Sequence, residues 1–470
     1  MELPFVKLIE TCTGQYIYDV GTNSIIKVEK KTYSNLQRMM KTGADVSDDP
    51  VLKRLMERGY LSSKKIEKIE HPYTEWADDY LSNRIYEIIL QVTQNCNFRC
   101  RYCTFSGDGR LDRKHSQKVM PWEVAKKAID FVIERNKYCR KLTVAFYGGE
   151  PLLEYPLIKR CVEYVNERVR GKEIKYTITT NASCITEEMV RFFIENDFSL
   201  MLSIDGSKES HDKNRRFASD GSGTFDHVMK KLQMIYDMSP EFFSSMSINS
   251  VWDQENDLEK QSKYLTTHPL LSKLPASIVA VESDRINTSF QITEDNVIKS
   301  KYLELMNVMA ALGCSKKEIS SNGYSDLRKY AKFARKITPI SGMPSSFHHS
   351  GPCVPGCSRL FVDIHGDFRP CEKVSGSSPV GIIGNVNNGI DIAKVKQLMN
   401  LGKLTEDECK NCWAMHFCEM CMVVADDNKC LSRDLKLRAC TSTKIAALVD
   451  LKKHVIMKEL GVRMEEIEDE

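Results

Sequence analysis

Four apolar segments of strand length lie between residues 84 and 206, and each ends in small or polar residues. In chain order they are RIYEIILQV, LTVAFYGG, IKYTITTN and FSLMLSIDG. The stretches between them show helical spacing of apolar residues, as in PWEVAKKAIDFVIER and LIKRCVEYVNERV. Strands that alternate with helices form a parallel sheet, and four or more such units predict an α/β fold with a whole or partial barrel. In such barrels the reactive groups lie on the loops that follow the carboxyl ends of the strands.

The chain has 470 residues, which is too long for one hydrophobic core, and we expect four regions. Residues 1–75 form a small unit, because YIYDVGTNSIIKV has the pattern of a β-hairpin and two helical segments follow it. Residues 84–300 form the barrel, and the polar, helical residues 301–350 are a bridging region. Residues 351–470 form a cysteine-rich domain with so few apolar residues that we expect metal to hold it together.

The bulk charge gives no sign of a nucleic-acid or membrane partner, since the net charge is only +3. The first residues, MELPFVKLIETCTG, lack the basic start and long apolar run of a signal peptide. No stretch approaches the roughly 18 consecutive apolar residues of a spanning helix. We therefore expect a cytoplasmic protein that has neither a nucleic-acid nor a membrane partner.

Cysteine is unusually abundant, with 17 residues in the chain. In a reducing compartment, clustered thiols are typical of metal sites or catalysis rather than of disulfides. Three of them lie in QNCNFRCRYC, and nine lie between Cys353 and Cys440. We expect the scattered remainder to be small buried side chains, namely Cys12, Cys139, Cys161, Cys184 and Cys314.

The first cluster, Cys96, Cys100 and Cys103, comes directly after the first predicted strand. Three thiolates can hold three corners of a four-iron cluster. The fourth iron is then open, and an open position on a metal is where a substrate binds. The spacing alone also allows a zinc site with a distant fourth ligand, or simply buried cysteines. The aromatic Tyr102 just before the last cysteine favours the iron–sulfur interpretation.

The pattern C-x3-C-x-Tyr-C at Cys96, Cys100 and Cys103 resembles the signature of the radical S-adenosylmethionine (SAM) enzymes. The resemblance implies a partial (β/α)6 TIM-type barrel in which these three catalytic cysteines hold a [4Fe-4S] cluster that binds SAM. Three later segments match the family in order: YGGEP, TTNA and SIDGSKESHDKNRRF. By this match the cofactor-binding residues would be Tyr102, Gly148, Gly149, Glu150, Pro151, Thr179, Asn181, Ser203, Asp205 and Arg215.

Each matching segment implies a contact with one part of SAM. The two glycines let the backbone approach a ligand closely, and the Glu150 carboxylate can bind the SAM ammonium group. The TTNA segment resembles the strand end that contacts the ribose. Ser203 and Arg215 would contact the SAM carboxylate, which suits a guanidinium, with the neighbouring Arg216 as the alternative to Arg215.

The C-terminal cysteines resemble the SPASM domain, whose pattern is C-x(9–15)-G-x4-C, then C-x2-C-x5-C-x3-C, then C. CVPGCSRLFVDIHGDFRPC fits the first part, whereas CKNCWAMHFCEMC has two residues rather than three between its last cysteines. The resemblance implies two auxiliary [4Fe-4S] clusters, one held by Cys353, Cys357, Cys371 and Cys421 and the other by Cys409, Cys412, Cys418 and Cys440. Cys430 competes with Cys440, and the first cluster has an open iron if Cys357 is not a ligand. A pair of zinc ribbons is the alternative.

Residues 1–75 resemble the PqqD-like peptide recognition element of peptide maturases, a winged-helix-like α+β unit. Such a unit can pair an exposed strand edge with an extended leader peptide. The alternative is a small domain that only packs on the barrel.

Together, the three parts resemble the sactipeptide and ranthipeptide maturases. The resemblance implies thioether crosslinks from cysteine sulfur to carbon in a ribosomally synthesised, cysteine-rich precursor peptide, formed through a 5′-deoxyadenosyl radical. It implies three [4Fe-4S] clusters, SAM, and an electron donor such as flavodoxin or ferredoxin. Carbon–carbon crosslinking, epimerisation, decarboxylation, sulfatase maturation and a zinc-stapled, non-enzymatic peptide-binding protein are the alternatives. The sequence does not identify the precursor peptide, the acceptor residue, the carbon attacked or the oligomeric state.

Overall fold

A ten-stranded sheet organises the molecule. The computed structural model describes residues 2–46, 48–105, 114–281, 290–291, 293–314, 321–349, 351 and 353–462. The strand order is β12-β11-β9-β8-β7-β5-β14-β15-β16-β17, and every pair from β12 to β14 is parallel. The strands of this parallel part are β5 (Glu87–Thr93), β7 (Lys141–Gly148), β8 (Glu173–Thr180), β9 (Phe198–Ser203), β11 (Ser247–Trp252), β12 (Ala276–Ala280) and β14 (Leu360–Val362).

The four strands expected from the sequence are β5, β7, β8 and β9, and their predicted parallel pairing is confirmed. β5 is buried along nearly its whole length, which agrees with its continuous apolar run, whereas buried residues alternate with less buried ones in β8 and β9. Ile88 and Val144 belong to the main core on the outer face, whereas Ile89 and Ala145 pack with Phe361 in a separate cluster. The sequence did not single out β11, whose apolar run is interrupted by Asn249 and Ser250, or the five-residue β12.

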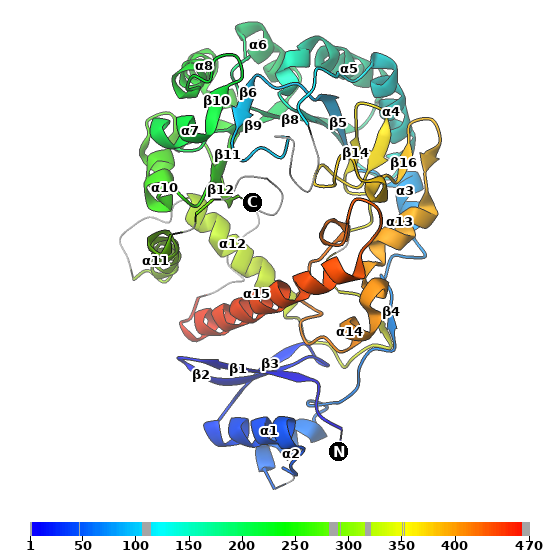
Figure 1. Cartoon of the computed structure of the whole chain (residues 1–470), viewed down its shortest axis with the longest axis vertical. Coiled ribbons are helices and arrows are strands. Elements are labelled where there is room, and N and C mark those ends of the chain that lie inside the picture. The colour runs from blue at the N-terminus through cyan, green and yellow to red at the C-terminus, as the bar shows by residue number, and fades with distance from the viewer. Residues whose placement is uncertain are drawn as a thin grey trace.

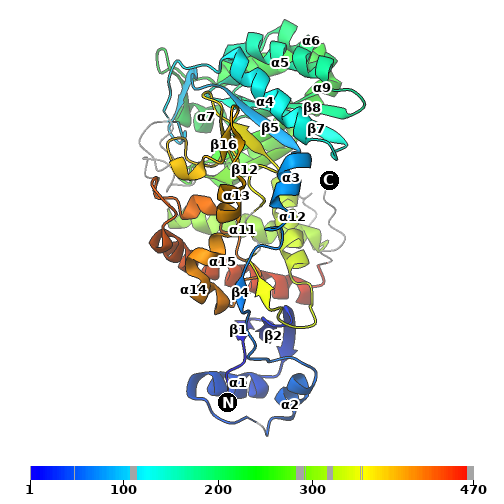
Figure 2. The same ribbon diagram turned by 90° about the vertical axis from the view of Figure 1, so that its right-hand side faces the viewer.

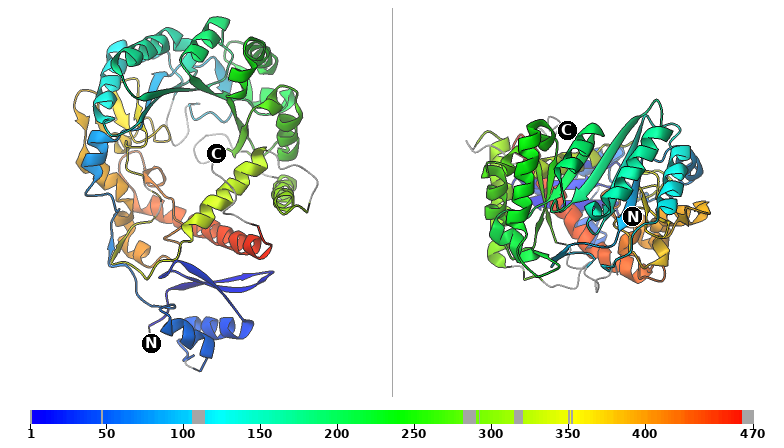
Figure 3. Two further views of the ribbon diagram at one scale, coloured as in Figure 1. Left: turned by 180° about the vertical axis from the view of Figure 1, so that it is seen from behind. Right: turned by 90° about the horizontal axis from the view of Figure 1, so that it is seen from above.

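Helices cover the convex side of the parallel sheet, and its concave side faces the centre of an open ring (Figure 1; Figure 3). Those of the barrel are α4 (Trp122–Arg135), α5 (Tyr155–Arg168), α6 (Glu187–Glu195), α7 (Lys208–Asn214), α8 (Phe225–Met238), α9 (Pro240–Ser244) and α10 (Leu258–Thr267). The helices α11 (Glu294–Ala311) and α12 (Ser321–Lys336) follow β12. Two short strands, β6 (Phe98–Cys100) and β10 (Arg215–Phe217), pair antiparallel outside the main sheet. They join the first cysteine segment to the segment after α7.

The N-terminal unit is a three-stranded antiparallel sheet with two helices. Its elements are β1 (Val6–Thr11), β2 (Gly14–Asp19), β3 (Ser24–Val28), α1 (Lys30–Thr42) and α2 (Pro50–Glu57). One cluster joins the sheet to the helices through Ile17, Leu36 and Leu52. A second cluster joins Tyr18 to Phe417 of the cysteine-rich region. The unit therefore packs on the C-terminal region, which separates it from the barrel (Figure 2).

The cysteine-rich region continues the barrel sheet. β14 pairs with β5, so that Leu360 lies opposite Ile88 and Val362 opposite Leu90. The remaining elements are β15 (Asp367–Arg369), β16 (Gly384–Asn385), β17 (Gly389–Ile390), α13 (Ile392–Met399), α14 (Glu406–Lys410) and α15 (Arg433–Glu459). Leu360 and Phe368 lie in the main core, so this region shares apolar burial with the barrel, which the sequence did not reveal.

The stretch between the N-terminal unit and the barrel is paired. Its strand β4 (Lys68–Ile69) runs parallel to β13 (Ser346–Phe347) of the bridging region, and α3 (Ala77–Asn83) precedes β5. The short 3-10 helices are η1 (Pro151–Glu154), η2 (Leu271–Lys273), η4 (Pro379–Gly381), η5 (Leu401–Thr405) and η6 (Met422–Val424). Among the described residues, no helix has the length and apolar character needed to cross a membrane.

Candidate active site

A cavity of about 550 Å³ lies at the carboxyl ends of the barrel strands. Most of the residues singled out from the sequence line it, although they come from four separate segments: Cys96, Cys100, Tyr102, Cys103, Gly148, Gly149, Glu150, Thr179, Asn181, Ser203 and Arg215. Two other predicted residues, Pro151 and Asp205, are buried and do not line the cavity. Pro151 is buried at the start of η1, and Asp205 is 1% exposed. The four motifs, which follow one another along the chain, therefore line the same cavity.

The cysteines of this cavity have surroundings that suit metal-bound thiolates. The backbone N–H of Phe98 donates to Cys96 Sγ at 3.4 Å. Burial raises the pKa of Cys96 to about 12, and the Phe98 N–H partly offsets this. Burial also raises the pKa of Cys100, against the lowering effect of the Arg215 guanidinium. Buried thiols of this kind lose their protons when a metal ion binds the sulfur.

Gly148 and Gly149 bring two loops into backbone contact. The Gly149 N–H donates to the Thr93 carbonyl at 3.1 Å, and the Glu150 N–H donates to the Asn95 carbonyl at 2.8 Å. A Cβ on Gly148 would lie 2.2 Å from the Thr93 oxygen, and one on Gly149 would lie 2.1 Å from the Asn95 oxygen. Gly148 also has φ of +147°, which favours glycine. The close approach that these glycines permit is thus to the cysteine loop, a role the sequence did not reveal.

The Glu150 carboxylate joins the loop after β7 to the loop after β8. Its Oε1 accepts from the Leu152 N–H at 3.0 Å and from the Thr180 hydroxyl at 2.7 Å. Its Oε2 accepts from the Asn181 N–H at 2.8 Å. Burial raises the pKa of Glu150, and these hydrogen bonds oppose that rise. Both oxygens therefore already have protein donors, and binding of an ammonium group stays a prediction.

Asp205 holds Arg215 in place. Its two oxygens bind the guanidinium, with Nε 2.9 Å from Oδ2 and Nη2 3.2 Å from Oδ1. Oδ2 also accepts from the Tyr102 hydroxyl, and Oδ1 accepts from the Val251 N–H at 2.9 Å. Across the β6–β10 pair, Arg215 lies opposite Cys100. The predicted arginine therefore reaches the cavity already paired with a carboxylate.

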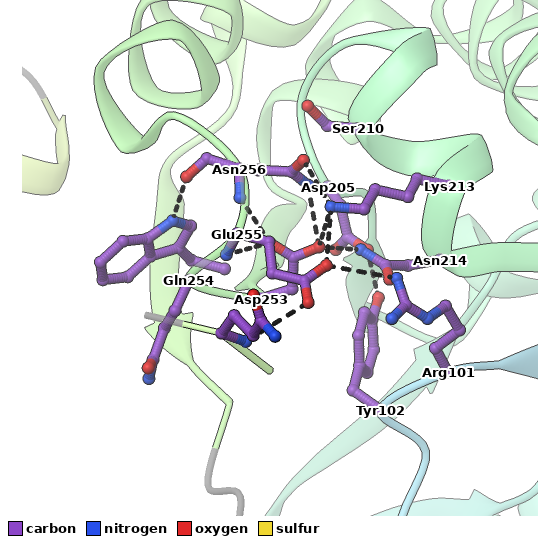
Figure 4. Close-up of polar contacts among 12 residues, drawn as sticks. Arg101, Tyr102, Asp205, Ser210, Lys213, Asn214, Asp253, Gln254, Glu255 and Asn256 are labelled. Atoms are coloured by element: carbon purple, nitrogen blue, oxygen red, sulfur yellow. Dashed lines mark hydrogen bonds and ion pairs between the residues drawn. The ribbon is translucent and has the colours of Figure 1, made fainter. Parts of the chain in front are cut away.

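A second acidic centre supports this wall from behind (Figure 4). Asp253 is fully buried and accepts from Asn214 Nδ2 at 2.8 Å and from the Asn256 N–H at 2.8 Å. Lys213 bridges Asp253 and Glu255, at 3.3 Å and 3.0 Å. Sequence reasoning missed Asp253, and nothing in its local pattern marks it. It fixes the end of α7, which leads directly into Arg215.

Asn97 is another residue that sequence reasoning missed. Its Oδ1 accepts from Asn181 Nδ2 at 3.0 Å, and its Nδ2 donates to the Ser183 hydroxyl at 2.8 Å. An amide placed between the first two cysteines was the available signal. It ties the cysteine loop to the loop after β8.

Residues 90–257 match the family model described as the Radical SAM superfamily. The chain carries a radical SAM domain. The three cysteines, the glycine pair and Arg215 all lie within this domain.

Proteins that resemble this chain in sequence include both uncharacterised and named members. An uncharacterised protein of Methanocaldococcus jannaschii is 27% identical over 332 residues, which are 70% of this chain and 95% of that protein. A cysteine-type anaerobic sulfatase-maturating enzyme of Clostridium novyi is 30% identical over 153 residues, or 32% of this chain and 39% of that enzyme. The radical SAM cyclopropyl synthase TigE of Paramaledivibacter caminithermalis is 29% identical over 162 residues, 32% of this chain and 33% of that enzyme. The matched segment thus spans less than half of either named enzyme.

A solved structure shares the fold. Native anSMEcpe with bound AdoMet superimposes with a TM-score of 0.55 at 19% identity, covering 78% of this chain and 99% of that one. The likeness to anSMEcpe therefore shows a shared partial-barrel fold, and it extends beyond the radical SAM domain itself.

Beyond the radical SAM domain, three of the four thiols expected at the first auxiliary site influence one another. Burial raises the pKa of Cys353, and Cys421 adds to this. Burial raises the pKa of Cys371 to about 11, and both Cys421 and Cys353 contribute. Cys357 differs in its hydrogen bond, because its thiol donates to the Arg84 carbonyl at 3.2 Å. Burial, then the Cys139 thiol and then the Cys353 thiol raise the pKa of Cys357 to about 12. The thiol of Cys357 is therefore buried and hydrogen-bonded to the backbone, although it too lies near Cys353.

The four thiols expected at the second auxiliary site line one cavity of about 230 Å³, namely Cys409, Cys412, Cys418 and Cys440. Cys430 is exposed, and its thiol contacts Asp427 instead. In the parts of the chain that the structure describes, no three His, Cys, Asp or Glu side chains converge closely enough to hold one metal ion. The four thiols lie on the walls of one cavity, which has room for a group larger than a single ion.

Proposed function

We propose that this radical SAM enzyme forms thioether crosslinks in a ribosomally synthesised, cysteine-rich precursor peptide. The names of two relatives, a sulfatase-maturating enzyme and a cyclopropyl synthase, support radical chemistry for this class of domain. When bound, SAM and a [4Fe-4S] cluster at Cys96, Cys100 and Cys103 would supply a 5′-deoxyadenosyl radical that takes a hydrogen atom from a carbon of the peptide.

The residues of the chain orient the bound groups. Asp205 holds Arg215 at the cavity wall, where its guanidinium can meet a carboxylate. Glu150 and Asn97 keep the loops after β5, β7 and β8 at fixed separations. Buried apolar residues of the cavity lining, such as Val281, would restrict water, which protects a reactive carbon from side reactions.

The observation that carries the thioether proposal is the set of three thiols at Cys353, Cys371 and Cys421, with the Cys357 thiol bound to a backbone carbonyl. Three protein ligands would leave one position of an auxiliary cluster open. A substrate cysteine would bind there as a thiolate, because metal binding releases the thiol proton. Joining its sulfur to the carbon radical would release one electron, which the auxiliary clusters would accept. The residues after Cys371, Glu372 and Lys373, line the active-site cavity, so the two sites are neighbours.

A leader peptide is the proposed ligand of the N-terminal unit. Its sheet has the order β1-β2-β3, so β3 is an edge strand. An extended peptide can add to such an edge through main-chain hydrogen bonds, beside the apolar cluster of Ile17 and Leu36. We further propose three [4Fe-4S] clusters, reduction by a flavodoxin or ferredoxin, and a location in the cytoplasm.

The test uses the anaerobically reconstituted full chain, SAM, dithionite and a synthetic peptide from a short cysteine-rich reading frame beside the gene. A thioether removes two hydrogens per crosslink, makes one cysteine unreactive to iodoacetamide, and prevents fragmentation between the linked residues. Cys357→Ala is expected to retain crosslinking, whereas Cys371→Ala is expected to abolish it while 5′-deoxyadenosine is still released. Crosslinking by Cys371→Ala at the wild-type rate would refute the role of the first auxiliary site.

Sulfatase maturation is the second candidate, because a relative of that name is 30% identical over the matched segment. A sulfatase peptide with a single cysteine separates the two functions. If it is oxidised with full fragmentation along its backbone, and the cysteine-rich peptide is unchanged, sulfatase maturation replaces crosslinking as the function.

A further inference from the structure

Lys436 is a lysine inside the protein, on the face of α15 that lines the cavity of the second auxiliary site. It is 1% exposed, which is rare for lysine unless its charge is compensated. Its ammonium group has three acceptors, the Leu401 carbonyl at 3.1 Å, the Thr405 hydroxyl at 2.6 Å and Cys409 Sγ at 3.5 Å. The three N–H groups of the ammonium are therefore all used.

Thr405 adds a second donor to the same sulfur. Its hydroxyl oxygen lies 3.3 Å from Cys409 Sγ. Because that oxygen accepts a hydrogen bond from Lys436, its own proton is available to the sulfur. Cys409 thus receives two hydrogen bonds, one from a cation. Cys357, in contrast, donates its proton to a carbonyl. The Cys409 sulfur is thus surrounded by donors, whereas the Cys357 sulfur is itself the donor.

The cation also acts on the neighbouring thiols. Burial raises the pKa of Cys440, and Lys436, one helical turn away, is the strongest influence that lowers it. Lys444 lies one turn beyond Cys440 and also lines the cavity. The carboxylate in the lining, Glu408, pairs with Arg433. At the first auxiliary site no buried lysine takes this role among the contacts described: Glu372 raises the pKa of Cys371, and Arg359 pairs with that carboxylate at 3.2 Å.

We propose that Lys436 raises the reduction potential of an iron–sulfur cluster held by Cys409, Cys412, Cys418 and Cys440. The proposal rests on the second auxiliary cluster of the proposed function. Reduction adds one negative charge, and a buried cation stabilises that charge because little solvent screens it. Hydrogen bonds to the cluster sulfurs act in the same direction. The second cluster is thereby easier to reduce than it would be without Lys436.

The test is an EPR-monitored reductive titration of the reconstituted full chain in the Cys96→Ala/Cys100→Ala/Cys103→Ala background, which leaves only the auxiliary clusters. Lys436→Met keeps the volume of the side chain and removes its charge. We expect one of the two reduction potentials to fall by at least about 59 mV, which is a tenfold change in the equilibrium constant of a one-electron reduction. The other potential should stay constant. Thr405→Val, which removes one donor and no charge, should shift the same potential by less.

Lys444→Met is the matched control, because Lys444 is exposed on the same helix and solvent screens its charge. Iron content separates the presence of the second cluster from the role of Lys436. If Cys440→Ser leaves the iron content of the background unchanged, the second cluster, and with it this part of the proposed function, is refuted. If both clusters are present and Lys436→Met shifts neither potential, or no more than Lys444→Met does, the role of Lys436 is refuted. Should Lys436→Met lose its cluster, an unshifted potential in Thr405→Val overturns the proposal.

Discussion

Arg215 and Asp205 are joined by two hydrogen bonds in a region where both side chains are less than a tenth exposed. Because Arg215 also lies opposite Cys100 in the β6–β10 pair, this ion pair connects the cysteine loop to the carboxyl end of β9. The same Asp205 carboxylate accepts the Val251 N–H from β11. One carboxylate therefore fixes three segments of the cavity.

Replacing Asp205 with alanine should destabilise the protein strongly. Arg215 would be left as an unpaired buried charge, which typically costs roughly 3–5 kcal/mol. Urea unfolding of the anaerobic protein measures this, and SAM binding should be lost as well. Asp205→Ala/Arg215→Met should recover part of the stability, because it removes the stranded charge. Asp226→Ala, which removes an exposed partner of Lys208, is the control and should leave the midpoint unchanged. Equal midpoints for Asp205→Ala and the control would contradict the prediction.

Gly149→Ala should abolish iron binding at Cys96 while the rest of the fold survives. The new methyl carbon would lie 2.1 Å from the Asn95 carbonyl oxygen and 3.0 Å from Cys96 Cβ, so the cysteine loop must move. Gly21→Ala is the matched control, since its methyl carbon would lie 3.5 Å from the nearest atom, an ordinary contact. Iron content and SAM binding are the readouts. A Gly149→Ala protein with wild-type iron and SAM affinity would show that the loops tolerate separation.

Cys440→Ser should remove about four irons per chain, whereas Cys430→Ser should remove none. Cys440 lines the cavity with three other thiols, and Cys430 is exposed beside Asp427. Iron and acid-labile sulfide per chain are measured after the same reconstitution for both variants. The reverse result, with iron lost only from Cys430→Ser, would mean that the residues after Cys421 rearrange to bring Cys430 into the site.

His211 should make stability fall as the solution becomes acidic. It is fully buried, accepts the Asp205 N–H at 3.3 Å and contacts the Thr224 hydroxyl at 3.0 Å. Burial, and then the Arg215 guanidinium, lower its pKa to about 4. The unfolded chain binds a proton below about pH 6.5 that the folded chain refuses, so stability is lost as pH falls.

Between pH 7.5 and 5.5 this loss should be about 1 kcal/mol. The histidines His348 and His416, whose pKa values burial also lowers, change stability in the same direction. The measurement is therefore the difference between wild type and His211→Gln in urea unfolding at the two pH values. Parallel pH dependences for the two proteins would show that His211 does not stay neutral in the folded state.

The sequence identified the parallel strands and the cavity residues because each motif directly follows a strand. Since the carboxyl ends of parallel strands meet at one edge, spacing along the chain becomes proximity in space. Asp253 could not be predicted in this way, since its partners Asn214 and Asn256 meet it only through the packing of α7 against the loop after β11. The orientation of Cys357 was equally hidden, because Arg84 is far away in sequence.

The extension of the sheet into the cysteine-rich region was also not predicted. β14 has only three residues, and a run that short has no periodicity to detect. Its burial comes from β5 rather than from its own neighbours in sequence. Composition therefore underestimated the apolar core available to residues 351–470.

The pairing of β14 with β5 has a consequence for biosynthesis. β5 is among the first barrel strands to leave the ribosome, and β14 is made only after all the other barrel strands. Until then one edge of β5 exposes unpaired N–H and C=O groups beside an apolar run, which invites association with other nascent chains. Truncated chains that end before Leu360 should therefore aggregate, and the cysteine-rich region serves the growing polypeptide as the cap that covers the open edge of β5.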